Sequence, residues 1–376
     1  MQPLVHFALA LALPPGGAAP AAASAAAGAR VAALQPPPLA LRVDSIVQPD
    51  GAIGPGGWIV VRNGRIESVG GGAPPAGAAA LEFAGGVAMA GFVDVATVLG
   101  AGGQLSEPAR AFTPEIAAAD AFDGDHSDFL AAARTGVTTV GLVPGASNVV
   151  GGRIGIVRTS DDDGRGAAVA GHGPLRFTLT EEPFGGLRAP TSRMGALPIL
   201  REMLANQKMA LAGSSLVAAD TADQIRIAVE TFGAAGRPFA LLQPARIDEA
   251  IELVTGKTAG AVLGPFDLDS SERDLRVSSL LAAAQIPITF TANGDGNALR
   301  LTAALATRSG LEARLARAAL SATGARLLGI DGDAGTLEPG RRGDLVVFDG
   351  DPLDLAAQVQ LVLVGGAAVA TEEEAR

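Results

Sequence analysis

The stretch Gly335-Thr-Leu-Glu-Pro-Gly-Arg-Arg-Gly-Asp-Leu-Val-Val-Phe-Asp-Gly-Asp-Pro-Leu-Asp354 decides the fold at the C-terminal end of the chain. It carries two turn clusters around an apolar run. Gly, Pro and Asp favour tight turns, whereas Val and Phe favour strands. Residues 359–364 follow as another apolar run of strand length. This end of the chain is therefore expected to form part of a β-sheet.

The same β-rich texture returns near the other end of the chain. There, short segments alternate apolar and polar residues, and Asn63-Gly64 is a strong hairpin turn signal. The strands expected in this region are residues 39–47, 58–62, 65–69 and 81–90. The economical interpretation is one small β-sandwich domain built from both ends of the chain, residues 38–90 and 330–370.

Between these ends, apolar strands alternate with helices. This alternation indicates a parallel sheet, here expected to close on itself. Seven strands are clear, and an eighth is expected within residues 152–158. The seven are residues 92–96, 136–143, 174–179, 209–218, 238–242, 259–263 and 286–291. We therefore expect an α/β protein with a (β/α)8 TIM-like barrel over residues 91–329.

Composition limits the classes of partner and chemistry. The length of 376 residues suits one barrel of about 250 residues and a smaller companion. Aromatic residues are only 4%, with no Tyr, so Ala, Val and Leu must fill the core. A net charge of −11 argues against a nucleic-acid partner and against anionic membranes. The absence of Cys excludes disulfides and zinc–thiolate sites, and no apolar run is long enough for a transmembrane segment.

Residues 1–37 form a low-complexity leader that we exclude from the fold. Its apolar run, residues 7–13, and the small residues around Ala25 resemble a secretory signal, although the positive n-region is missing. This pattern favours a periplasmic or secreted location over the cytoplasm. The alternative is a disordered leader rich in Ala, Pro and Gly.

Several motifs in order along the chain resemble the amidohydrolase superfamily, specifically its imidazolonepropionase-like branch. The closing stretch quoted above is similar to the family's closing motif. Shorter matches are Asn63-Gly-Arg-Ile66, Gly91-Phe-Val-Asp94, Gly136-Val-Thr-Thr-Val140, Pro190-Thr-Ser-Arg-Met-Gly195 and Ala222-Asp-Gln-Ile225. Together with the closing stretch, the resemblance covers roughly residues 39–365. Most of these motifs are scaffold, and we expect Asp344 to orient a turn.

The resemblance implies one or two divalent metals, zinc among them, held by His and Asp at the carboxyl ends of the barrel strands. The family's ligand positions are occupied here by side chains that do not fit this role. They are Ala96 and Val98 on the first strand, Ala218 on a middle strand, Gln243 on the next, and Asn293 on the last. The resemblance therefore predicts a degenerate site with no metal cofactor.

Three carboxylates remain as candidates for chemistry. The resemblance makes Glu181 a retained carboxylate at a strand end. Asp220 stands where a second His of the middle strand is expected. Asp295 lies two residues beyond Asn293, so a shift in register could place it in the last ligand position. Without a metal, paired carboxylates would work by general acid–base catalysis.

The histidine count supports the loss of the metal site without any alignment. The chain has three His, namely His6, His126 and His172, and no two have the i, i+2 or i, i+4 spacing of a zinc site. His126 enters an acidic loop, where we expect a helix cap at Asp125 or Ser127.

The leading hypothesis is a non-catalytic amidohydrolase homologue. It would act as a partner of an active paralogue, as a homo-oligomer, or as a small-molecule binder at the barrel mouth. The alternative is a hydrolase of non-peptide carbon–nitrogen bonds with a remodelled site. A third possibility is an exported structural or interaction protein.

Overall fold

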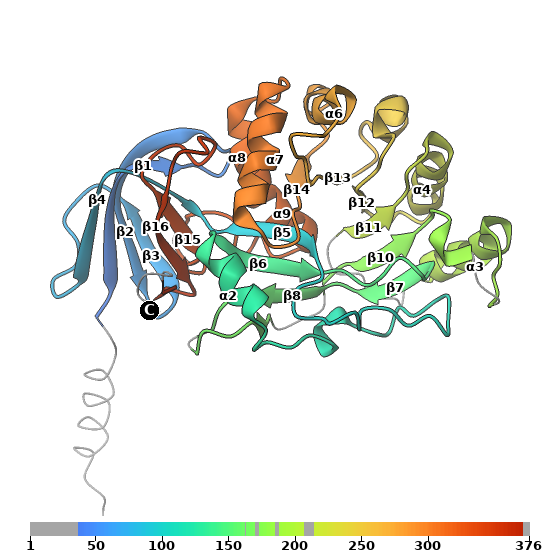
Figure 1. Ribbon diagram of the computed structural model, residues 1–376, viewed down its shortest axis with the longest axis horizontal. Coiled ribbons are helices and arrows are strands. Elements are labelled where there is room, and N and C mark those ends of the chain that lie inside the picture. The colour runs from blue at the N-terminus through green and yellow to red at the C-terminus, as the bar shows by residue number, and fades with distance from the viewer. Residues whose placement is uncertain (1–36, 162, 170–172, 185–187, 207–213, 371–376) are drawn as a thin grey trace, which may run out of the picture. The chain divides into compact units, whose positions relative to one another are not determined.

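The computed structural model describes residues 37–161, 163–169, 173–184, 188–206 and 214–370. The chain divides after Pro37, and the unit that follows is a mixed α/β protein (Figure 1). The expected leader and its export signal lie outside the described residues. Within those residues, no helix has the length and apolar character needed to cross a membrane.

Strands from both ends of the chain pair in one seven-stranded sheet. β15 lies antiparallel to β4, which lies parallel to β1. Asn63 and Gly64, both with positive φ, turn β2 into β3 as their type predicts. In order across the sheet, the strands are β17 (Ala367–Ala368), β16 (Val359–Val364), β15 (Leu345–Phe348), β4 (Ala79–Ala90), β1 (Leu39–Val47), β2 (Ile53–Arg62) and β3 (Arg65–Gly70).

The two ends of this sheet share one apolar core. Ile59 and Ile66 from β2 and β3 belong to the same buried cluster as Leu345 and Leu363 from β15 and β16. The structure thus has one sheet that folds over its own apolar face, where the sequence predicted a two-sheet sandwich. Asp344 orients a turn here, as expected, because its carboxylate accepts a hydrogen bond from the Gly365 N–H at 2.6 Å.

The remaining strands form two further sheets. All neighbouring pairs from β10 to β14 are parallel, as are β5 and β6. The six-stranded sheet has the order β14 (Ile288–Phe290), β13 (Gly260–Leu263), β12 (Phe239–Leu242), β11 (Ser215–Ala218), β10 (Leu175–Thr178) and β7 (Val150–Arg153). The four-stranded sheet has the order β5 (Phe92–Thr97), β6 (Val137–Leu142), β8 (Gly155–Arg158) and β9 (Ala167–Ala168).

Helices connect the parallel strands, and α3, α4, α6 and α7 lie in a row beside β10–β14 in Figure 1. The α-helices are α2 (Ser127–Arg134), α3 (Arg193–Ala205), α4 (Ala222–Ala234), α5 (Ile251–Val254), α6 (Glu272–Ala283), α7 (Gly296–Arg308), α8 (Ala313–Leu320) and α9 (Ala322–Leu328). Short 3-10 helices are η1 (Ala118–Asp120), η2 (Glu182–Phe184) and η3 (Ile247–Ala250). Ser321 separates α8 from α9.

The eighth strand expected within residues 152–158 differs from the prediction. This region forms two short strands, β7 antiparallel to β10 and β8 antiparallel to β6. Gly152 has a φ of 105°, a conformation that glycine adopts easily, just before the chain passes from one sheet to the other. Among the described residues, β5 and β14 share no ladder. The single closed sheet that we expected is therefore not found.

Candidate functional site

The carboxyl ends of the parallel strands, together with the residues that directly follow them, form what we call the strand-end face. In α/β proteins with parallel strands this is where ligands and catalytic groups gather. Val98 and Asn293, which follow β5 and β14, are joined there by a hydrogen bond, so these two strand ends are adjacent. The five positions that the resemblance implies as ligand positions all lie at strand ends of this face.

Two side chains at those positions connect neighbouring strand ends. The Asn293 side-chain oxygen accepts a hydrogen bond from the backbone N–H of Val98 at 2.9 Å. The Gln243 side-chain amide donates to the carbonyl oxygen of Gly264 at 2.7 Å, which joins the end of β12 to the end of β13. Both amide groups are therefore held by a neighbouring strand end, Asn293 through its oxygen and Gln243 through its nitrogen.

The same two residues have an unusual backbone conformation. Gln243 has a φ of 47° and Asn293 a φ of 51°. Asn tolerates this left-handed region, whereas Gln is rarely found there. Each such residue costs of order 1 kcal/mol and persists only where its surroundings hold it. Here the conformation accompanies a side chain that bonds to the next strand.

The side chains of the strand-end face do not fit a zinc ion. Zinc takes imidazole, thiolate or carboxylate ligands, usually four in all. Ala96 and Ala218 offer methyl groups, and the Val98 isopropyl group is 56% exposed. Over the part of the chain that the structure describes, no group of three or more His, Cys, Asp and Glu is arranged to hold a metal ion.

The histidines give no ligand pair either. His126 is itself the N-cap of α2, because its ring accepts a hydrogen bond from the backbone N–H of Asp128. The cap expected at Asp125 or Ser127 is therefore shifted to the residue between them, and Asp125 instead pairs with Arg165. His6 and His172 lie outside the described residues.

Asp94 is a fully buried carboxylate between β5 and β14, and sequence reasoning assigned it no role. One oxygen accepts hydrogen bonds from the backbone N–H groups of Ala292 and Gly294 at 2.9 and 2.7 Å. The other lies 2.5 Å from the Thr291 hydroxyl, which also lies 2.7 Å from the Ala96 carbonyl oxygen. These side-chain bonds connect the two strands where backbone pairing between them is missing.

A single hydroxyl hydrogen cannot serve two acceptors, so the protonation of Asp94 matters. If the carboxyl group keeps its proton, it donates to Thr291, and Thr291 then donates to Ala96. Burial is the main influence on the pKa of Asp94 and raises it, although its four hydrogen bonds act in the opposite direction. Asp94 therefore keeps its proton to a higher pH than a free aspartate does.

The three carboxylates singled out from the sequence have different surroundings. Glu181 pairs with Arg193, and its side chain is 79% exposed. Asp295 caps α7, where it accepts hydrogen bonds from the N–H groups of Asn297 and Ala298 at 2.8 and 3.2 Å. Asp220, which follows β11, is half-buried and faces the strand-end region. The three are therefore not brought together as one constellation.

The structure instead brings Glu182 near enough to Asp220 for its charge to act on that carboxyl group. Burial first, and then the charge on Glu182, raise the pKa of Asp220. The pKa of Glu182 is lowered, chiefly by a hydrogen bond from the Thr180 hydroxyl and also by the charge on Arg176. Two neighbouring carboxylates with opposite shifts form an acid–base pair in chemical terms. The sequence contained no sign that Glu182, and not Glu181, would face Asp220.

A largely buried arginine lies beneath this pair. Burial lowers the pKa of Arg176 to about 10, and the charge on Glu182 opposes the shift. Arg176 and Thr178 alternate along β10 and so lie on one face, and Thr180 follows two residues after the strand. Among the described residues, the Arg176 Nε and the fully buried Thr178 hydroxyl have no hydrogen-bond partner. The sequence did indicate this buried charge, because Arg176 is the one charged residue in the strand predicted at residues 174–179.

Comparison with known proteins gives a partial family match. Residues 270–370 match the profile of the Amidohydrolase family. No curated protein matches the chain. The C-terminal segment thus agrees with the resemblance found in the sequence at the level of the family.

Solved structures extend the likeness to most of the chain. An amidohydrolase from Thermotoga maritima MSB8 has a TM-score of 0.76 at 21% identity, over 89% of this chain and 100% of that one. A putative prolidase from Bifidobacterium longum has a TM-score of 0.55 at 18% identity, over 89% and 95%. A Xaa-Pro dipeptidase with bound methionine has a TM-score of 0.52 at 13% identity, over 88% and 99%. At these identities the likeness shows the fold alone.

Proposed function

We propose that this protein is a non-catalytic relative of the metal-dependent amidohydrolases, close to the imidazolonepropionase-like branch, that works by binding. One observation carries the proposal. The polar side chains at the family's ligand positions, Gln243 and Asn293, hydrogen-bond to neighbouring strand ends, and the remaining positions carry hydrocarbon groups. The fold does not need a metal at these positions, because the interstrand bonds hold the strand ends together.

The binding site in this proposal is the strand-end face. Arg176, Glu182 and Asp220 place a buried cation under two carboxylates, and the Thr178 hydroxyl has no partner among the described residues. The Thr178 hydroxyl is closed to solvent, so in this proposal a polar ligand binds through the exposed Glu182 and the half-buried Asp220. The occupant is a small molecule, or a segment of an active paralogue or of a second copy of the chain.

The experiment is metal analysis of the purified full chain. The protein is incubated with Zn²⁺, dialysed, and measured by inductively coupled plasma mass spectrometry. The proposal expects a zinc content well below one per chain, and no rise in melting temperature with added Zn²⁺. A tightly held ion at one per chain would overturn it. An Asp220→Ala variant then shows whether any retained ion lies on the strand-end face.

A second candidate is a metal-free hydrolase of non-peptide carbon–nitrogen bonds. The opposite pKa shifts of Glu182 and Asp220 favour it. Glu182 would take a proton from the attacking water, and Asp220 would give its proton to the departing nitrogen as the C–N bond breaks. The products are a carboxylic acid and an amine, and a proton passing from Glu182 to Asp220 restores the starting state.

Cyclic amides test this second candidate. Turnover by the full chain that is abolished in Glu182→Gln and retained in Glu181→Gln would support hydrolysis. The two substitutions are matched, because they remove one negative charge at adjacent positions and only Glu182 lies beside Asp220. Equal activity in the two variants, or none in the wild type, would argue against it.

A further inference from the structure

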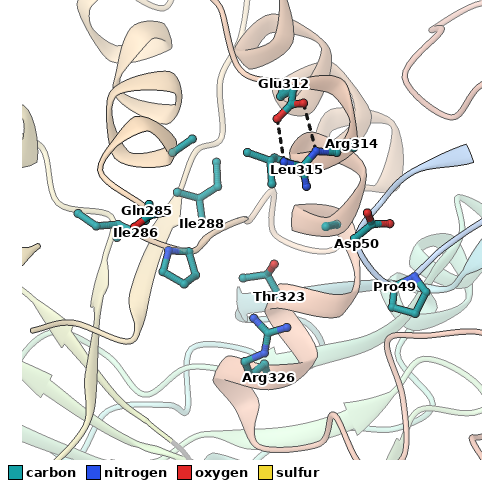
Figure 2. Close-up of a pocket in the computed structure, with 13 residues that line it drawn as sticks. Pro49, Asp50, Gln285, Ile286, Ile288, Glu312, Arg314, Leu315, Thr323 and Arg326 are labelled. Carbon is teal, nitrogen blue, oxygen red and sulfur yellow. Dashed lines mark hydrogen bonds and ion pairs between the residues drawn. The ribbon is translucent and has the colours of Figure 1, made fainter. Parts of the chain in front are cut away.

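A pocket lies at the opposite end of β14 from the strand-end face. It has a volume of about 440 Å³, within the range of small-molecule sites. Residues 285–288, which lead into β14, form one of its walls, and α8 and α9 form others (Figure 2). The turn at Pro49 and Asp50, between β1 and β2, completes the lining. None of these residues belongs to the site described above.

The pocket is held in shape by contacts behind its walls. Arg317 of α8 donates to the Gly51 carbonyl oxygen at 3.0 Å, and its guanidinium also pairs with Asp351 at 2.7 Å. Gly51 has a φ of 82°, and a Cβ there would lie 1.8 Å from the Arg314 carbonyl oxygen. The turn is thus fixed against α8 at a distance that only glycine allows. This cavity exists before any ligand arrives, which lowers the entropic cost of binding.

One side of the pocket is apolar. Ile286 and Ile288 from the start of β14 face Leu315 and Ala318 from α8. Ile286 and Ile288 are nearly fully buried, with exposed fractions of 4% and 5%. Together with the half-buried Leu315 and Ala318, they give this side of the pocket a hydrocarbon lining that suits an apolar ligand body.

The charged groups of the pocket leave one cation without a partner. Arg314 makes two contacts of 3.1 Å with the Glu312 carboxylate, drawn as dashed lines in Figure 2. The Asp50 carboxylate accepts a hydrogen bond from the Ala52 N–H at 3.1 Å within its own turn. Arg326 has no side-chain hydrogen bond or ion pair with any described residue, so it is the group available to an anion.

A hydroxyl group accompanies this cation. Thr323 and Arg326 are three residues apart on α9, which places them on one face of the helix. Figure 2 shows both side chains on the side of the pocket opposite the Glu312–Arg314 pair. Thr323 is only 8% exposed, and its hydroxyl has no hydrogen-bond partner within the described part of the chain. Because Thr323 lines the pocket, this hydroxyl is available to donate a hydrogen bond to a ligand.

We propose that this pocket binds a small monocarboxylate with an apolar body. The carboxylate accepts hydrogen bonds from the Arg326 guanidinium and the Thr323 hydroxyl, and the body lies against Ile286, Ile288 and Leu315. A single negative charge suits the site better than a phosphate dianion, because Asp50 and Glu312 also line it. The site is independent of the proposal for the strand-end face.

Isothermal titration calorimetry of the full chain with hexanoate, benzoate and phenylacetate tests the proposal. Hexanamide, benzamide and phenylacetamide keep the shape and lose the charge, and inorganic phosphate tests the anion alone. We expect one-to-one binding of at least one carboxylate, and much weaker binding of its amide and of phosphate. No binding of any carboxylate at millimolar concentration, or equal binding of acid and amide, would overturn the proposal.

Variants locate the binding. Arg326→Gln is expected to raise the Kd of the bound carboxylate about tenfold or more, since a hydrogen bond to a charged group is lost. Thr323→Val, which keeps the shape, should raise it by a smaller factor. Arg201→Gln removes the same charge from an exposed position on α3 and should leave the Kd unchanged. An unchanged Kd in Arg326→Gln, or a loss of binding in Asp220→Asn on the strand-end face, would place the ligand elsewhere.

Discussion

The side-chain oxygen of Asn293 accepts a hydrogen bond from the backbone N–H of Val98 at 2.9 Å and so joins the end of β14 to the end of β5. Both residues stand at positions where the resemblance to the amidohydrolases implies metal ligands. An interaction within the protein therefore takes the place expected for a metal. This contact can be tested by its effect on stability.

Asn293→Ala should lower the free energy of unfolding by about 2 kcal/mol. About half comes from the lost hydrogen bond and half from placing Ala in the left-handed region. Asn293→Gly keeps the backbone conformation easily and should lose only about 1 kcal/mol. Urea unfolding measures both. Asn297→Ala, at an exposed position in the first turn of α7, is the control, and equal losses in all three variants would contradict the assignment.

Asp94→Asn should change how stability depends on pH. Burial raises the pKa of Asp94 in the folded state, so its contribution is fully present below the unfolded pKa of about 3.9. It is lost as the pH rises through the folded pKa. Asn mimics the protonated carboxyl group and does not titrate. The wild type should therefore lose stability relative to Asp94→Asn as the pH rises.

Urea unfolding at a series of pH values follows this difference between the wild type and Asp94→Asn. Asp269→Asn, at an exposed position, is the control, and its free energy of unfolding should follow that of the wild type across the pH series. If the free energies of unfolding of the wild type and of Asp94→Asn differ by the same amount at every pH, the pKa of Asp94 does not change on folding.

Glu182→Gln should lower the pKa of Asp220, because the negative charge on Glu182 helps to raise it. The carboxyl resonance of Asp220, followed by carbon NMR during a pH titration, reports this value directly. Glu181→Gln removes the neighbouring charge, which pairs with Arg193, and should have a much smaller effect. If the two variants shift the pKa of Asp220 equally, the placement of Glu182 is wrong.

Arg300→Met should lower the free energy of unfolding by about 3 kcal/mol. Arg300 is 4% exposed and donates to the carbonyl oxygens of Pro352, Asp354 and Ala357, and these acceptors would lose their partner. The guanidinium also lies 4.8 Å from the centre of the Phe348 ring. Thermal and urea unfolding measure the loss, and Arg308→Met, exposed on the same helix, should be nearly neutral. Comparable losses of unfolding free energy in both variants would mean that the hydrogen bonds of Arg300 to residues 352–357 do not contribute to stability.

Much of the strand order followed from periodicity and turn chemistry. Residues 92–96 and 238–242 were expected as strands and correspond to β5 and β12, because a short apolar run between turn residues has few other ways to be buried. Asn63-Gly64 turned the chain as expected, since both residues accept positive φ. These features depend on neighbours in the sequence, so they can be predicted without a structure.

The sequence by itself also predicted that no His-rich zinc site would form, because the chain has only three His, and no two have the spacing of a zinc site. Only the tertiary structure decided which carboxylates meet. Glu181 and Glu182 are adjacent, yet Glu181 pairs with Arg193, whereas Glu182 accepts a hydrogen bond from the Thr180 hydroxyl and its charge acts on Asp220. The roles of Asp295 as a helix cap and of Asn293 as a link between strands likewise depend on partners that are distant in the sequence or on the local backbone direction. The residue type fixes the chemistry of a side chain. Its contacts depend on the course of the backbone, which is determined by packing with residues elsewhere in the sequence.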